Sequence, residues 1–140
     1  TRKDTSEAVK YCGISTMAAK SIMVVGDDDG AFALKPLGKG LEFTPLAKPD
    51  AIKKDAPIRF KLTRDGQPVK QAKVFGSFGG FSSNDETSVA FYATTDLKGE
   101  FEFKALKEGL WYLKTTVNTD SGDKNCEIFN DKASVSFMVR

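Results

Sequence analysis

The sequence contains no histidine and only two cysteines among its 140 residues. Without histidine, the chain lacks the most common general base and the most common metal ligand of proteins. No apolar stretch reaches the roughly 18 residues that a membrane-spanning helix needs, so we expect no direct membrane insertion. The first residues are polar and no hydrophobic segment follows them, so we expect no signal peptide within this sequence. Because the chain does not begin with Met, we interpret it as a processed or excised fragment.

Positive and negative charges nearly balance. The chain has 21 Lys and Arg against 19 Asp and Glu, a net charge of +2. A protein that binds nucleic acid usually carries a clustered basic patch, and the sequence has none, so we expect no nucleic-acid partner. The length fits one domain, which can bury about two-thirds of the surface that its unfolded chain exposes.

The two cysteines, Cys12 and Cys126, stand near opposite ends of the chain. They predict either a disulfide that ties both ends of the fold together or a pair of unconnected thiols, and two cysteines alone do not decide between these. A disulfide that closes so long a loop could stabilise the fold by about 4–5 kcal/mol in the chain-entropy model.

Alternating apolar and polar residues predict about eight short strands separated by turns, with no sustained helical period. Prolines follow one of them, so it either lies at a sheet edge or stops there, and Asp65-Gly66 predicts a tight turn. The expected strands are 21–25, 41–44, 58–62, 69–75, 89–93, 100–103, 111–117 and 135–139. This spacing is typical of an all-β, immunoglobulin-like antiparallel β-sandwich of about 7–9 strands. We assign it to residues 19–140 and expect residues 1–18 to be a linker or lead-in.

The clearest pattern lies in residues 93–117, where we expect three consecutive strands to form an antiparallel meander. Phe101 and Phe103 alternate with charged residues, and Trp111 begins a second inward row. A turn over 95–99 joins the first two strands, because Asp can accept from its own backbone two residues on and Gly tolerates positive φ. Residues 76–85 and 118–130 are expected to be loops.

Two acidic segments could supply oxygen ligands to a hard cation such as Ca²⁺. One is Asp27, Asp28 and Asp29, and the other contains Asp120 and Asp123. The second segment faintly resembles a calcium loop but lacks the closing glutamate. The alternative is that both segments are solvated loops, which is the interpretation we favour, and we expect no cofactor.

Aromatic residues on a Gly/Ser-rich loop could contact a partner. Phe78 and Phe81 would serve as exposed anchors there, or one or both would fold back and cover an open end of the sandwich. Trp111 is expected to be the core aromatic of the sandwich and not a ligand platform.

Catalysis finds little support in the sequence. Glu100 and Glu102 share one face of a strand about 7 Å apart, a separation that resembles a glycosidase pair. Lys104 continues the same face and nothing nearby would raise a carboxyl pKa, so we interpret the row as a solvated strand face. We expect no enzymatic activity.

Three stretches resemble a known family when they are taken together. They are 36–46 (PLGKGLEFTPL), 65–74 (DGQPVKQAKV), and 95–101 (TDLKGEF) followed by 108–113 (EGLWYL). In this order and spacing they resemble the C-terminal part of bacterial periplasmic proteins labelled nickel-transport family proteins, and the resemblance covers about residues 11–139. Because this chain has no histidine, none of the family's metal-ligand positions is carried onto it.

The resemblance implies an exported β-sandwich, periplasmic or at the cell surface, with a second domain upstream. We therefore expect a non-enzymatic accessory or scaffold part of a periplasmic solute-binding or nickel/cobalt uptake-associated protein. Its expected partners are the upstream domain of the same protein and a membrane transporter complex. The alternative is a structural or adhesin-like module that binds another protein. A cation-binding or small-molecule-binding domain that uses the acidic loops is a third option.

Overall fold

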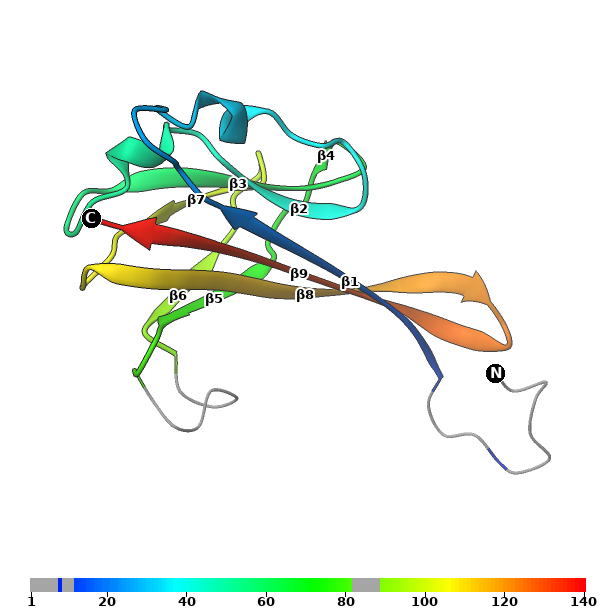
Figure 1. The fold of residues 1–140 in the computed structure, drawn as a ribbon. Coiled ribbons are helices and arrows are strands. Elements are labelled where there is room, and N and C mark those ends of the chain that lie inside the picture. The colour runs from blue at the N-terminus through cyan, green and yellow to red at the C-terminus, as the bar shows by residue number, and fades with distance from the viewer. Residues whose placement is uncertain (1–7, 9–11, 82–88) are drawn as a thin grey trace.

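Two β-sheets packed face to face make up the structure (Figure 1). The computed structural model describes residue 8 and residues 12–81 and 89–140. The strands of the first sheet, in spatial order, are β1 (Gly13–Ile22), β9 (Cys126–Val139), β8 (Gly109–Asp123), β5 (Lys73–Phe78) and β6 (Phe91–Thr94). The second sheet contains β2 (Leu41–Pro45), β3 (Ile58–Arg64), β4 (Gln67–Pro68) and β7 (Glu100–Phe103). Two short 3₁₀ helices, η1 (Ala31–Leu34) and η2 (Pro49–Ala51), flank β2.

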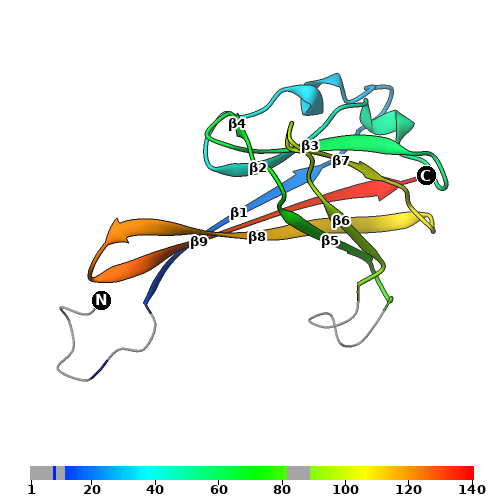
Figure 2. The ribbon, with the colours of Figure 1, turned by 180° about the vertical axis from the view of Figure 1, so that it is seen from behind.

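The connectivity confirms the predicted immunoglobulin-like sandwich. In the second sheet, β3 is central, with β2 on one side and with β4 and β7 end to end on the other. In the first sheet, β9, β8 and β5 are consecutive antiparallel neighbours, and β6 forms the far edge (Figure 2). If β3, β7, β5, β8 and β9 are equated with strands B, E, C, F and G, the pairings are those of the immunoglobulin fold. Only the β1–β9 pair is parallel among the described strands.

Aromatic side chains fill the space between the sheets. Phe60 from the second sheet and Phe137 from the first have ring centroids 5.3 Å apart. Phe103 lies 5.3 Å from Trp111 and 5.4 Å from Phe137, both in edge-to-face geometry. All four side chains are fully buried, as the sequence predicted for Trp111. The Trp111 indole N–H donates to the Lys107 carbonyl at 2.8 Å, so its one polar atom is satisfied inside the core.

The predicted meander over residues 93–117 is wrong, although its strands exist. β6 and β8 belong to the first sheet, whereas β7 pairs with β3 in the second. Similarly, residues 69–75 do not form one returning strand, because β4 stops at Pro68 and the chain crosses to the other sheet before β5 begins. Alternation shows which side chains are buried but does not show which strand lies alongside, since both sheets bury the same kind of face.

The predicted loop at residues 118–130 is also wrong. β8 and β9 continue as one long hairpin that turns only between Asp123 and Cys126, with an irregularity after Asp120. The β8 part of the segment, residues 118–123, projects beyond the sandwich and is mostly exposed on both faces, so it needs no apolar row. Its backbone ladder forms regardless of side-chain polarity.

The first strand begins earlier than the sequence pattern indicated. β1 covers Gly13–Ile22, so residues 13–18 belong to the sheet, and the apolar residues 23–25 follow the strand. Residues 1–7 and 9–11 of the expected lead-in lie outside the described residues. Similarly, Gly76 to Phe78 belong to β5, and residues 82–88 of the expected loop are not described.

We predict that Gly99→Ala destabilises the fold more than Gly66→Ala. Both glycines have positive φ, +74° and +82°, which costs an alanine about 1–2 kcal/mol. A Cβ on Gly99 would also come within 2.7 Å of the Leu62 carbonyl oxygen, whereas a Cβ on Gly66 meets nothing within 4 Å. Overpacking of this kind adds roughly 1–3 kcal/mol. Urea unfolding measures both losses, and equal losses would contradict the close approach of the turn to β3.

Candidate functional site

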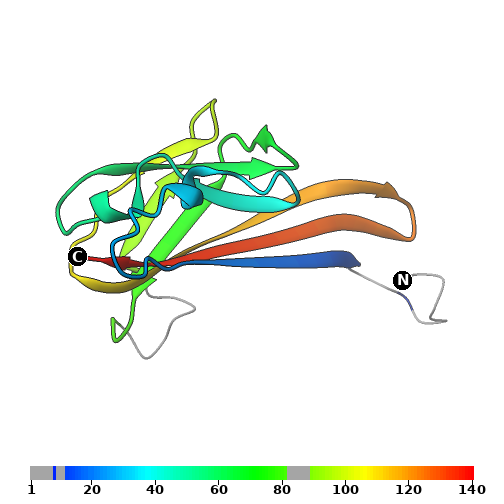
Figure 3. The ribbon, with the colours of Figure 1, turned by 45° about the horizontal axis from the view of Figure 1, so that its top comes forward.

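The first sheet extends past the second as a three-stranded arm, which we define as residues 13–19 of β1, 117–123 of β8 and 126–132 of β9 (Figure 3). All seven of the β1 residues in the arm are exposed, whereas Trp111, Leu113 and Thr115 of the same sheet are buried under the second sheet. The arm therefore has strand pairing but little hydrophobic support.

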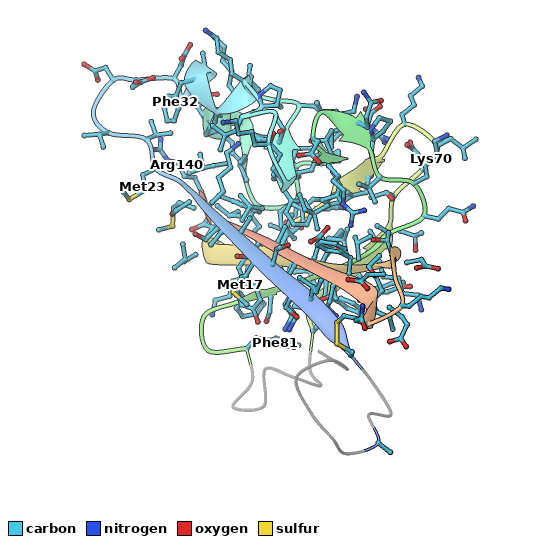
Figure 4. The ribbon with its side chains drawn as sticks, turned by 90° about the vertical axis from the view of Figure 1, so that its right-hand side faces the viewer. Met17, Met23, Phe32, Lys70, Phe81 and Arg140 are labelled. Carbon is cyan, nitrogen blue, oxygen red and sulfur yellow. A yellow bond between two sulfur atoms is a disulfide. The ribbon has the colours of Figure 1, made fainter. Side chains whose placement is uncertain are left out.

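A disulfide closes the arm at the point where two of its strands begin. Cys12 and Cys126 are bonded, with their Cα atoms 4.7 Å apart and 114 residues apart in sequence. From there β1 and β9 run parallel for the whole of β1, from Gly13 opposite Ile128 to Ile22 opposite Phe137. The bond is visible at the start of β1 in Figure 4. It therefore holds the edge strand of the arm to its only paired neighbour among the described strands.

A charged contact joins the arm to the second sheet. The guanidinium of Arg64, at the end of β3, lies 2.5 Å from a carboxylate oxygen of Asp131 on β9. The hydroxyl of Thr16 on β1 donates to the other oxygen of the same carboxylate. Both partners of the ion pair are largely covered, and together the three residues line a cavity of about 290 Å³. Asp131 thus links three strands from both sheets.

The opposite end of β1 borders a larger apolar hollow, which we call the methionine groove. It has a volume of about 450 Å³, and its lining includes Met23, Val25, Pro49, Leu110, Met138 and Arg140. Met23, Val25, Leu110 and Met138 are each more than half exposed, with Val25 at 79%. Figure 4 shows Met23 and Arg140 on this side of the molecule. The groove was not predicted, because its side chains come from strand ends that the sequence keeps far apart.

The composition of the methionine groove suits an adaptable binding surface. All three methionines of the chain are exposed; Met23 and Met138 line the groove, and Met17 lies on β1. Thioether side chains are flexible and polarisable, and they adjust to differently shaped partners. Arg140 is the only charged residue of the lining. Its backbone N–H donates to the Ile52 carbonyl at 3.1 Å, and its carbonyl accepts from the Lys54 N–H at 2.7 Å, so its position is held.

The two predicted acidic segments lie at opposite ends of β1. Asp27, Asp28 and Asp29 follow its last residue, whereas Asp120 and Asp123 are near the arm tip, beside its first. Ten strand residues separate these ends by about 30 Å. The described residues contain no group of three or more His, Cys, Asp or Glu that could hold a metal ion.

Most of these carboxylates stabilise their own loops. Asp28 accepts from the Gly30 N–H at 2.8 Å, and Asp120 accepts from the Gly122 N–H at 2.8 Å. Asp123 accepts from the backbone and side-chain amides of Asn125. Asp29 lies 2.5 Å from the Lys48 ammonium, and this hydrogen bond lowers the pKa of the Asp29 carboxyl.

Phe78 and Phe81 come together at one end of the sandwich. The Phe78 ring lies 4.9 Å from Trp111 and 5.2 Å from Phe81, and the Lys107 ammonium is 5.4 Å from the Phe78 centroid. Phe78 is half-buried, and Phe81 packs on it while remaining 41% exposed. The pair extends the aromatic core to the surface.

The acidic row of β7 faces a basic row of β3. Glu102 is directly opposite Arg59, and Glu100 is opposite Lys61, so opposite charges alternate across the outer face of the second sheet. The Arg59 guanidinium also reaches Asp96 at 3.1 Å. As the turn pattern predicted, Asp96 accepts backbone N–H bonds, from Glu100 at 3.0 Å and Lys98 at 2.8 Å. These bonds, the one from Glu100 first, lower the pKa of the Asp96 carboxyl.

Comparison with known proteins identifies one family. A family model described as a domain of unknown function (DUF4198) matches residues 2–119. No curated protein matches the chain, and no solved structure matches it. In the part of the chain that the structure describes, no helix is long and apolar enough to span a membrane.

We predict that removal of the disulfide lowers the free energy of unfolding by about 2–5 kcal/mol, because the bond closes a long loop and the arm has little other support. Thermal melts of the protein with and without reductant, compared with Cys12→Ser/Cys126→Ser, measure the change. Reductant should have no further effect on the double variant. An unchanged melting temperature on reduction would contradict a stabilising role for the bond.

Proposed function

Because the chain belongs to the DUF4198 family of domains of unknown function, which brings no activity with it, we propose a function from the molecular surface: a non-enzymatic, exported module that docks a partner polypeptide in the methionine groove. The observation that carries this proposal is the groove itself. It gathers exposed apolar side chains from separate strands around one hollow.

The chemistry of the groove indicates what would occupy it. Burial of one Leu- or Met-sized side chain in an apolar pocket contributes about 1.5–3 kcal/mol. Arg140 at the groove is positioned to pair with a carboxylate beside that side chain. The occupant is therefore an extended protein segment that carries a bulky apolar residue next to an acidic one.

The disulfide supports export. Disulfides form and persist in oxidising environments such as the bacterial periplasm and the cell surface, and they are rare in the cytosol. The Cys12–Cys126 bond clamps an arm that has little other support, so it is a structural bond of the kind such compartments maintain. A periplasmic or cell-surface location follows from this reasoning.

The more specific role rests on the sequence resemblance alone. In that role the module is the accessory or scaffold part of a periplasmic solute-binding or nickel/cobalt uptake-associated protein. The groove then docks the upstream domain of the same protein or a subunit of a membrane transporter. In the alternative role, a structural or adhesin-like module, the same groove binds a protein outside this system. The two roles differ in the identity of the partner.

Site-specific photocrosslinking of the full-length protein in its native host tests the proposal. A photoreactive residue at Leu110, in the methionine groove, should crosslink to a polypeptide, whereas one at the equally apolar, 71% exposed Leu97, in the turn between β6 and β7, should not. Arg140→Glu should weaken the crosslink from position 110, because it opposes the acidic group of the partner.

The identity of the crosslinked polypeptide then separates the two roles. The upstream domain or a transporter subunit supports the accessory role, and an extracellular protein supports the adhesin-like role. No crosslink from position 110 above the level at position 97 would overturn docking in the groove.

A further inference from the structure

The outer edge of β1 is open, and it adjoins the methionine groove only at its last two residues, Ser21 and Ile22. β1 is ten residues long and pairs with β9 along one side. No described residue pairs with its other side, and Figure 3 shows it as the outermost strand of the first sheet. In a parallel ladder every second residue directs its N–H and C=O away from the paired neighbour. About half of the β1 backbone groups are therefore free to pair with another strand.

The other sheet edges carry features that discourage strand addition. β2 ends at Pro45, and β4 contains Pro68, which has no N–H to donate. β6 and β7 are only four residues long, and β7 carries Glu100 and Glu102. Short edges, prolines and charges are the devices by which natural sheets avoid edge pairing.

β1 has none of these devices. Its sequence, GISTMAAKSI, contains no proline and one charged residue, Lys20. The Lys20 ammonium is directed toward β2, where it donates to the Phe43 carbonyl at 3.4 Å and lies 3.8 Å from a carboxylate oxygen of Glu42. The Lys20 charge is thus paired within the same molecule and does not oppose the addition of another strand to the β1 edge.

We propose that two copies of the chain pair antiparallel through their β1 edges about a two-fold axis, which joins the two five-stranded sheets into one continuous sheet. Such isologous pairing presents the same strand on both sides of the interface. This inference goes beyond the proposed function, since the seam uses the backbone edge of β1, whereas the groove takes a different partner and is lined mostly by residues outside β1.

The pattern of β1 suits a second copy. A two-fold axis perpendicular to the sheet keeps each face continuous, so residues opposite each other must belong to the same face. A centre at Met17, which is 78% exposed, places Ser15 opposite Ala19 and Gly13 opposite Ser21. Lys20 then faces Ile14 of the second copy. No like charges meet along the seam, and small side chains predominate.

The shape of the molecule also leaves room for this pairing. The arm end of β1 is not covered by the second sheet, whereas the other end is. Antiparallel pairing places the arm of each copy beside the sandwich of the other, so the two second sheets do not compete for the same space. A strand pair alone is at the low end of interface sizes, so the dimer should form at micromolar concentrations or above.

Analytical ultracentrifugation over a range of concentrations tests the proposal. The unmodified chain should change from monomer to dimer as its concentration rises. Ser15→Lys/Ala19→Lys should remain monomeric, because it places like charges at the seam, and so should Ser15→Glu/Ala19→Glu. An equimolar mixture of the two variants should recover the dimer. Thr116→Lys/Asn118→Lys, with the same added charge on exposed positions of the interior strand β8, should dimerise like the unmodified chain.

Three results would each overturn the pairing: an unmodified chain that stays monomeric at every concentration, a dimer that the β1 lysines do not weaken, or a mixture that does not recover. Crosslinks from position 19 to a different protein would assign the edge to a foreign strand instead of a second copy. Circular dichroism and the melting temperature of each variant confirm that its monomer is folded. Crosslinking from Leu110 is unaffected by the β1 variants if the groove and the edge are separate sites.

Discussion

The aromatic contact between the two sheets is the interaction on which the rest of the structure depends. Phe60 and Phe103 on one sheet pack against Trp111 and Phe137 on the other. These four rings mark the region in which the two sheets cover each other. β8 and β9 continue past the rings, so the arm beyond them relies on backbone pairing. The Cys12–Cys126 bond supplies the constraint that hydrophobic burial supplies elsewhere. The fold thus consists of a region held by its core and a region held by a crosslink.

The sequence predicted the core well and the connections poorly. Alternation with a period of two correctly identified Phe101, Phe103 and Trp111 as inward residues. The turn at 95–99 was also predicted correctly, because the Asp96 carboxylate is close enough to accept a hydrogen bond from the backbone two residues on. Strand partners were assigned wrongly because ladder hydrogen bonds join residues far apart in sequence, and alternation contains no information about them. Residues 118–130 resembled a loop because the β8 side of the arm, which is mostly exposed on both faces, needs no apolar row.

The candidate binding surfaces were missed for the same reason. Met23 and Val25 were expected inside a strand, while Leu110 and Met138 stand at outward positions that alternation marks as solvent-facing. Only the fold brings these four side chains to one hollow. Residues 13–18 of β1 were predicted to belong to the lead-in, because these small, uncharged residues show little pattern. That absence of prolines and guarding charges is itself the signal of an open edge, once the strand is known to be there.

The central claim is that β1 is an ordered edge strand that is paired on one side and open on the other. Amide hydrogen exchange of residues 13–22, measured by NMR in dilute solution, tests it most directly. The account predicts that protection alternates along β1. Amides that donate to β9 should be as strongly protected as the β9 amides that donate to β1, and the amides between them should exchange at nearly the solvent rate. Uniformly fast exchange along β1 beside a protected β8–β9 hairpin would contradict it.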